Sequence, residues 1–201
     1  MGRITHERWL QAQAAELVEY WDHRPEISFD GFSKVFMYLG VDPKTSFKGQ
    51  TIVEVAAGSV PALMMVEGAK RRVAVEPLMD SEKWKPQREA CEAAGVEIIA
   101  EAYEYIDIDP SVGVDETWLF NALEHVIDPV EQMKKAMETS QRVRLFEATN
   151  GLPPSTAHPH TITKELIESV MGEFGQVYIG GSIKENFHQS DCYYGTWERN
   201  V

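Results

Sequence analysis

The stretch IVEVAAGSVP at residues 52–61 decides the fold, together with the apolar run VAV at residues 73–75 and the Glu76 that ends it. A short β-branched run that stops at small residues is typical of a buried parallel strand that turns tightly into a helix. A second strand that ends in a carboxylate about 20 residues on is suited to hydrogen bonds with ribose hydroxyls. The pattern therefore predicts a nucleoside site at the carboxyl edge of an open α/β sheet.

Strand-like and helix-like segments alternate along the chain. Strands are expected near residues 52–56, 73–75, 96–99, 117–121 and 143–147, and helices near 61–67, 81–94, 129–139 and 164–173. This alternation indicates a parallel sheet that is covered on both faces. Helix candidates at 5–21 and 32–39 predict an N-terminal helical cap over residues 1–48, with residues 49–201 as the core of a single domain. Residues 176–183 and 193–199 are β-like and predict a final hairpin.

Three segments resemble class I S-adenosylmethionine-dependent methyltransferases. Residues 52–61 are similar to the first motif of that family, residues 96–102 to its third strand, and WLFNALEHVIDP at residues 118–129 to its fourth strand and the LEHV-DP signature that follows. Two strand-and-helix units fit between the first and last of these, as that fold needs. The resemblance runs from Thr51 to Phe174. It implies a Rossmann-like, seven-stranded, mostly parallel sheet with helices on both faces and a C-terminal antiparallel hairpin.

The resemblance also implies the cofactor S-adenosyl-L-methionine and a set of residues that contact it. Glu76 takes the position of the ribose ligand and Glu101 the position that meets the adenine amino group. Where the family usually carries three glycines, this chain has Ala56, Gly58 and Val60. Without the resemblance, a single glycine after a strand marks only a turn. The cofactor-binding residues predicted in this way are Glu54, Ala56, Gly58, Glu76, Glu101, Ala102 and Asn121.

Composition limits the classes of partner. The chain has 201 residues, is 43% apolar and 25% charged, and shows no linker of Gly, Ser and Pro, so it suits one compact domain. It has 19 Lys and Arg residues and 32 carboxylates, which give a net charge of −13. This negative charge disfavours nucleic acid as a partner. No apolar run is long enough to span a bilayer. We therefore expect a cytoplasmic protein without a membrane partner. Cys91 and Cys192 imply neither a disulfide framework nor a structural zinc.

Two features bear on the chemistry after the fourth strand. The sequence Asn121-Ala122-Leu123-Glu124 lacks the Asn/Asp-Pro-Pro-Tyr and Pro-Cys residues with which related enzymes methylate bases in DNA. Asp128 can share a metal ion with His125 and Glu124, but the following proline and Glu131 favour a helix N-cap instead. No metal is therefore assigned. His125 is a candidate catalytic residue that touches substrate or holds a loop beneath the cofactor, or else it serves as a structural donor, and the sequence leaves these readings open.

The loop NGLPPSTAHPHT at residues 150–161 is a candidate for the acceptor side of the site. It follows the fifth strand and precedes a helix that Thr163 is expected to cap. His158 and His160 are candidate general bases, because loops at this edge face the ligand crevice. The alternative is a solvated turn without a catalytic role. The aromatic residues Trp9, Tyr20, Trp21, Phe29 and Phe36 are expected to form the core of the cap, with recognition of an organic acceptor as the second reading.

The sequence thus predicts methyl transfer from S-adenosylmethionine to an oxygen or nitrogen atom of a small-molecule acceptor. One alternative is an enzyme of the same fold that acts on protein or RNA. Another is a non-catalytic module that binds a nucleoside or a partner protein, motivated by Ala56 and Val60 in the glycine motif. A homo-oligomer is compatible with the sequence.

Overall fold

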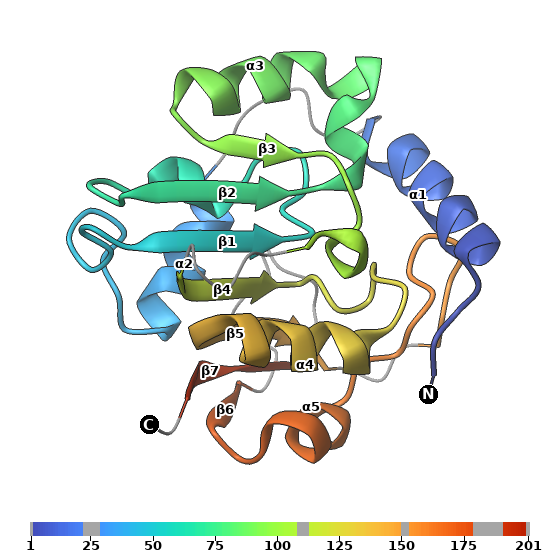
Figure 1. Cartoon of the computed structure of the whole chain (residues 1–201). Coiled ribbons are helices and arrows are strands. Elements are labelled where there is room, and N and C mark those ends of the chain that lie inside the picture. The colour runs from blue at the N-terminus through green and yellow to red at the C-terminus, as the bar shows by residue number, and fades with distance from the viewer. Residues whose placement is uncertain (1, 22–28, 108–112, 150–152, 179–190, 200–201) are drawn as a thin grey trace.

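The computed structural model describes residues 2–21, 29–107, 113–149, 153–178 and 191–199, in which a central sheet lies between two layers of helices (Figure 1). The sheet has the strand order β3-β2-β1-β4-β5-β7-β6. Strands β1 to β5 are parallel, and β7 runs antiparallel to both β5 and β6. The predicted mostly parallel sheet with a C-terminal hairpin is confirmed. The strands are β1 (Thr51–Val55), β2 (Arg71–Val75), β3 (Glu97–Ile99), β4 (Val114–Phe120), β5 (Ser140–Ala148), β6 (Gly175–Tyr178) and β7 (Cys192–Glu198).

Helices cover both faces of the sheet. On one face α2, α3 and the short helices η1 to η3 pack on Ile52 and Trp118, and on the other α4, α5 and η4 pack on Val53 and Leu119. This division follows the alternation of side chains along each strand. Within the described residues, no helix is long and apolar enough to span a membrane. The helices are α1 (His6–Trp21), α2 (Asp30–Tyr38), α3 (Lys85–Ala93), α4 (Pro129–Thr139), α5 (Lys164–Met171), η1 (Ala62–Met65), η2 (Pro77–Asp80), η3 (Glu82–Trp84) and η4 (Tyr103–Tyr105).

Helix α4 begins where the sequence predicts. Asp128 Oδ1 accepts hydrogen bonds from the backbone amides of Val130 at 3.0 Å and Glu131 at 3.2 Å, and a proline follows the cap residue. The N-cap reading of Asp128 is therefore confirmed. Thr163 caps α5 in the same way, through the amide of Leu166 at 3.2 Å. The two caps fix where the chain re-enters the helical layer after β4 and β5.

The prediction of a helix at residues 61–67 is wrong, because the segment forms only the single 3₁₀ turn η1. Arg72 explains where this turn stops. Its guanidinium donates to the carbonyls of Leu63 at 3.2 Å and Val66 at 2.9 Å, and also to that of Ala94 at the end of α3. Carbonyls that a longer helix would pair internally are thus taken by a side chain from β2.

The two N-terminal helices lie in different places. Figure 1 shows α1 across the carboxyl ends of the strands, whereas Phe36 of α2 is buried on a sheet face against Trp118. Trp9 Nε1 donates to the carbonyl of His125 at 3.1 Å, and Arg8 donates to the carbonyls of Thr156 and Ser155 at 2.9 and 2.6 Å. The expected cap is therefore divided, and α1 alone covers the loops that follow β4 and β5. The side chains of Tyr20 and Trp21 lie outside the described residues.

Candidate functional site

The candidate site lies at the carboxyl ends of the central strands. The chain passes from β1 to β2 and β3 on one side, and then crosses to β4 and β5 on the other. The strand order therefore reverses between β1 and β4. Open α/β sheets bind their ligands in the crevice at such a reversal.

Two strained residues mark this point. Among the described residues, Ala56 and Asn121 are the non-glycine residues with positive φ, at 50° and 54°. They directly follow β1 and β4, the two strands between which the order reverses. A left-handed conformation costs a residue such as alanine about 1–2 kcal/mol. Strain of this kind concentrates at functional sites, so both positions point to a ligand.

Gly58 borders open space in the loop after β1. Its φ is +64°, and a Cβ atom built on it would meet no protein atom within 4 Å. Its backbone amide donates to Glu76 Oε2 at 2.9 Å, which ties the glycine loop to the end of β2. Val60, at the third glycine position of the motif, is half-buried. The space beside Gly58 is where the sequence predicts the cofactor.

Glu76 is buried at the end of β2, with 5% of its surface exposed. Besides the amide of Gly58, it accepts a hydrogen bond from the amide of Leu78, whose nitrogen lies 3.0 Å from Oε1. Burial raises the pKa of its carboxyl group. A carboxylate offers about four acceptor positions, so the two amides leave positions for ribose hydroxyls. Its assignment as the ribose ligand remains a prediction.

We expect Glu76→Ala to weaken binding of S-adenosylmethionine by about 1–3 kcal/mol, because hydrogen bonds to a charged group are lost. The stability of the fold should also fall by about 1–3 kcal/mol, since the amides of Gly58 and Leu78 lose their acceptor. Calorimetric titration and urea unfolding measure the two effects. Glu97→Ala, which removes an exposed carboxylate at the amino end of β3, is the control. Unchanged affinity in Glu76→Ala would contradict its role in binding.

Glu54 holds the turn that follows the glycine loop. Its two carboxylate oxygens accept hydrogen bonds from the amides of Ala62 and Leu63, both at 3.0 Å. Burial raises the pKa of this carboxyl group to about 8, and the negative charge of Glu76 adds to the shift. Glu54, which the resemblance assigns to the cofactor, therefore acts on the site by fixing the N-terminus of η1.

The raised pKa of Glu54 predicts a fold that is more stable in mild acid. Between the ordinary value of 4.5 and about 8, the folded state holds a proton at Glu54 that the unfolded chain has lost. This contribution to stability is fully present below pH 4.5 and is lost as the pH rises through about 8. We expect the free energy of unfolding to fall by about 1–3 kcal/mol over this range. Urea unfolding of wild type and Glu54→Gln at several pH values tests this. An equally steep pH dependence in the variant would contradict it.

Asn121 connects the end of β4 with the loop behind it. Its side-chain Nδ2 donates to Glu124 Oε1 at 3.1 Å, and its backbone amide donates to the carbonyl of Phe146 at 2.8 Å. Its side-chain Oδ1 is buried and has no hydrogen-bond partner among the described residues. A buried acceptor without a partner costs about 1–3 kcal/mol. A ligand with a donor group at this position would recover that cost.

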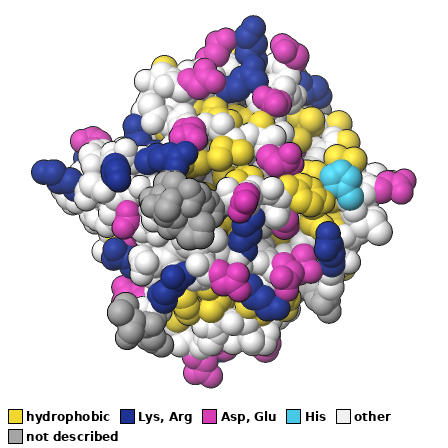
Figure 2. Space-filling model, in the orientation of Figure 1, with side chains coloured by type: hydrophobic (Ala, Val, Ile, Leu, Met, Phe, Trp, Pro, Cys, Tyr) yellow, Lys and Arg dark blue, Asp and Glu magenta, His cyan; other side chains and the backbone are white. Residues whose placement is uncertain are grey.

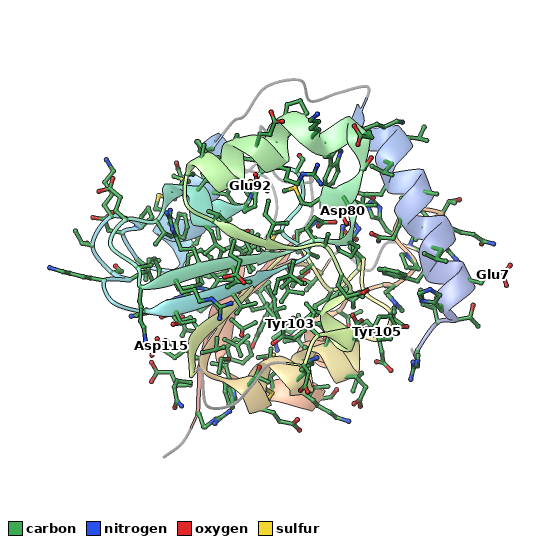
Figure 3. All side chains as sticks on the ribbon, turned by 45° about the horizontal axis from the view of Figure 1, so that its top comes forward. Glu7, Asp80, Glu92, Tyr103, Tyr105 and Asp115 are labelled. Atoms are coloured by element: carbon green, nitrogen blue, oxygen red, sulfur yellow. The ribbon has the colours of Figure 1, made fainter. Side chains whose placement is uncertain are left out.

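Glu101 and Ala102, both predicted near the adenine, lie in different surroundings. Glu101 is exposed and accepts a hydrogen bond from the amide of Ala102 at 2.9 Å. It lines an open hollow of about 540 Å³ between β3 and α3, whose wall includes Asp80 and Glu92 (Figure 3). Ala102 is buried against Trp9 of α1. The structure therefore brings Glu101, but not the side chain of Ala102, to an open surface.

Glu147 is a buried acid that the sequence analysis did not select. It lies in β5, and its Oε1 accepts hydrogen bonds from the amides of Ala122 at 2.7 Å and Leu123 at 3.1 Å. Burial raises the pKa of its carboxyl group well above the ordinary value. Glu147 thus fixes the start of the loop after Asn121. The sequence signal was available, since Glu147 follows Leu145 and Phe146 near the end of a predicted strand, much as Glu76 follows β2.

His125 and His158, two of the candidate catalytic residues, lie together in the structure. Their ring centroids are 4.8 Å apart, and both rings face Glu16 of α1. Glu16 Oε2 lies 3.7 Å from His125 Nδ1 and 3.6 Å from His158 Nε2. The three residues come from α1 and from the loops after β4 and β5. We call them the Glu-His-His cluster.

His160 is not part of this cluster. It is buried, and its Nε2 lies 2.8 Å from the carbonyl of Val126, to which it donates as a neutral ring. Burial lowers its pKa, which favours that neutral form. His160 thus joins the loop after β5 to the loop after β4. Of the two histidines proposed as bases, the geometry favours His158. The loop's residues 150–152 lie outside the described residues.

Known structures share this fold over nearly the whole chain. The N-terminal domain of EvdMO1 with S-adenosylhomocysteine (SAH) bound is 16% identical, with a TM-score of 0.57 and coverage of 98% of both chains. The same domain in the presence of SAH and D-fucose gives 15% identity, a TM-score of 0.55 and the same coverage. A complex between the Haloferax volcanii Trm112 methyltransferase activator and a candidate methyltransferase gives 10% identity and a TM-score of 0.60, covering 98% of this chain and 100% of that one.

A candidate RNA methyltransferase from Pyrococcus horikoshii, PH1948, is also similar. It is 13% identical with a TM-score of 0.58, and the match covers 93% of this chain and 99% of that one. No protein-family model matches the sequence, and no curated protein matches it. At these identities the similarity establishes the fold alone, and function has to be inferred from the geometry of the site.

Proposed function

Because the chain has the fold of class I S-adenosylmethionine-dependent methyltransferases, we propose that it transfers a methyl group from S-adenosylmethionine to an oxygen or nitrogen atom of a small molecule. One observation carries this proposal. The strained residues Ala56 and Asn121 flank the point where the strand order reverses, beside the open space at Gly58. A sheet that only supported a partner protein would gain nothing from this strain.

The residues at this point fit the cofactor. The space beside Gly58 admits a bulky group close to the backbone, and Glu76 retains acceptor positions for hydroxyls. The buried Oδ1 of Asn121 suits a donor such as an ammonium group. When bound, S-adenosylmethionine supplies an electrophilic methyl group on a positively charged sulfur. The acidic side chain of Glu124, which contacts Asn121 at the end of β4, favours such a cation over its neutral product.

The protein's own contribution is alignment and removal of the acceptor's proton. Helix α1 is held on the loops after β4 and β5, and such a cover positions an acceptor against the strand ends. Transfer of a methyl group to an oxygen or nitrogen atom would require the acceptor to give up a proton, and a base on the protein would take it. His125 and His158 stand on those same loops and Glu16 stands on α1, so we assign activation of the acceptor to the Glu-His-His cluster.

The charge of the chain supports a small-molecule acceptor over RNA. Binding a phosphate backbone requires Lys and Arg, and this chain has 19 of them against 32 carboxylates. On the face drawn in Figure 2, basic side chains are interspersed with acidic ones. The EvdMO1 domain, which was studied with D-fucose, is a fold relative associated with a small organic molecule.

Two measurements test the proposal. In separate calorimetric titrations, S-adenosylmethionine and SAH should each bind with a stoichiometry of one per chain. Absence of binding for both ligands would overturn the proposal. Incubation with S-adenosylmethionine labelled in the methyl group and a cell extract should then place the label in the low-molecular-weight fraction. Label in the protein or RNA fraction would overturn the small-molecule acceptor and retain methyl transfer. Binding without any label transfer would favour a non-catalytic module.

A further inference from the structure

The Glu-His-His cluster is assembled by contacts that hold α1 in one position. Trp9, Ala12, Gln13 and Glu16 form one buried stripe along α1. Trp9 and Arg8 fix the start of the helix on the backbone of the two loops that carry His125 and His158. A carboxylate on a buried stripe is costly unless it is paired or binds a cation. A cation held beside Glu16 would therefore be stabilised by its carboxylate.

The three side chains of the cluster are close enough to share one ion. A carboxylate oxygen of Glu16 and one nitrogen each of His125 and His158 all lie within 4.8 Å of one another. The two nitrogen–oxygen distances, 3.6 and 3.7 Å, exceed the roughly 2.7–3.2 Å of an N–H···O hydrogen bond. Two ligand atoms that each lie about 2.1 Å from one ion at the tetrahedral angle are ~3.4 Å apart. The measured distances are close to this value.

A second carboxylate, that of Glu124, lies on the far side of the His125 ring from Glu16. His125 Nδ1 faces Glu16, and His125 Nε2 lies 3.6 Å from Glu124 Oε1. Glu124 in turn accepts the hydrogen bond from Asn121 Nδ2. A histidine ligand commonly directs its other ring nitrogen to a carboxylate, which fixes the tautomer and the ring orientation. Glu124 places a carboxylate on this side of the His125 ring, and its hydrogen bond with Asn121 connects it to the end of β4.

From this geometry we propose that Glu16, His125 and His158 bind one divalent transition-metal ion of the zinc or cobalt class. Two imidazoles and one carboxylate are the ligands these ions prefer, whereas magnesium prefers oxygen atoms alone. The side chain of Glu16 is 8% exposed, that of His125 13% and that of His158 28%. The site is therefore open on the side of His158. Three protein ligands with an open side leave a coordination position for water or an acceptor.

The role of the ion, but not its binding, rests on the proposed function. Held on the loops after β4 and β5, it lies on the side where the acceptor is expected. A bound hydroxyl group loses its proton more readily, because the ion stabilises the resulting alkoxide. Loss of the acceptor's proton would then depend on the ion. This proposal replaces the expectation from the sequence that the chain holds no metal.

The test is titration of the full chain, stripped with a chelator, with Co²⁺ and separately with Zn²⁺. Wild type should bind one equivalent of either ion. Glu16→Gln and His158→Gln should each weaken this binding at least about a hundredfold, and Glu124→Gln about ten- to a hundredfold. Glu7→Gln and His6→Gln are matched controls on exposed positions of α1, and Figure 3 shows Glu7 pointing away from the rest of the chain. Circular dichroism checks that each variant is folded.

A measurement on wild type alone keeps the proposal testable if the variants do not fold. Nuclear magnetic resonance of the Co²⁺ form should show two paramagnetically shifted, exchangeable imidazole N–H signals, one for each histidine ligand. Failure of wild type to bind either ion, fewer than two such signals, or equal loss of binding in His6→Gln and His158→Gln would overturn the proposal. Because these titrations contain no S-adenosylmethionine, their outcome is independent of whether the chain binds that cofactor.

Discussion

Gly58→Val is expected to abolish binding of S-adenosylmethionine while the sheet stays folded. A Cβ atom at this position meets no protein atom within 4 Å, so the isopropyl group would occupy the open space beside the strand ends rather than disturb the core. That space is where we expect the adenosine part of the cofactor to approach the backbone. We expect affinity for S-adenosylmethionine to fall more than about a hundredfold. The cofactor can no longer approach the backbone closely, and valine adds about 1–2 kcal/mol of backbone strain at this position.

A matched substitution separates the loss of space from the strain. Gly49 has a φ of +77° and also has no atom within 4 Å of a built Cβ, but it precedes β1 at the opposite edge of the sheet. Gly49→Val should therefore lower the urea midpoint as much as Gly58→Val does, and leave calorimetric affinity for S-adenosylmethionine unchanged. If Gly58→Val is folded and binds with wild-type affinity, the cofactor does not lie at this loop.

The architecture was predictable because its signals are local. Buried β-branched runs and the residues that end them gave the five parallel strands and the caps of α4 and α5. The segment at residues 61–67 shows where such signals fail. Its composition suits a helix, but Arg72 from the next strand takes the carbonyls of Leu63 and Val66, and the turn ends at Val66. A tertiary hydrogen bond of this kind leaves no periodic trace in the sequence.

The acids of the site were predictable as a class but not in their individual contacts. Glu76 was selected because it ends a strand, and Glu54 because the resemblance assigns it to the cofactor site. The structure shows that both accept backbone amides, and that Glu147 does the same for the loop after β4. Which amide reaches which carboxylate depends on the path of the loops, and that path depends on packing. Sequence reasoning therefore located the site more reliably than it assigned each contact.

The Glu-His-His cluster could not have been predicted from spacing. Its two histidines stand on loops after different strands, and Glu16 comes from a helix at the start of the chain. Sequence analysis paired His125 with its neighbours Glu124 and Asp128, because short spacing was the available guide. Asp128 instead caps α4. The placement of Glu16 depends on how Trp9 and Arg8 anchor α1, which is a property of the folded chain alone.

Replacing His158 by glutamine is expected to lower turnover at least about a hundredfold and to leave affinity for S-adenosylmethionine within about twofold of wild type. Activation of the acceptor acts on the transition state, so its loss appears in kcat. His160→Gln is the control within the same loop, because that ring holds the carbonyl of Val126 and does not face the cluster. It should lower the melting temperature and leave turnover within about threefold.

The double variant that combines Glu16→Gln with His158→Gln tests whether the cluster acts as one unit. If Glu16 and His158 activate the acceptor together, Glu16→Gln should reproduce the loss in His158→Gln, and combining the two should add little. Kinetics with the identified acceptor and calorimetry with S-adenosylmethionine measure the two quantities on the same preparations. If the loss of turnover in the double variant equals the product of the two single losses, the two residues act independently. Wild-type turnover in His158→Gln would leave alignment of the acceptor, rather than its activation, as the source of the rate.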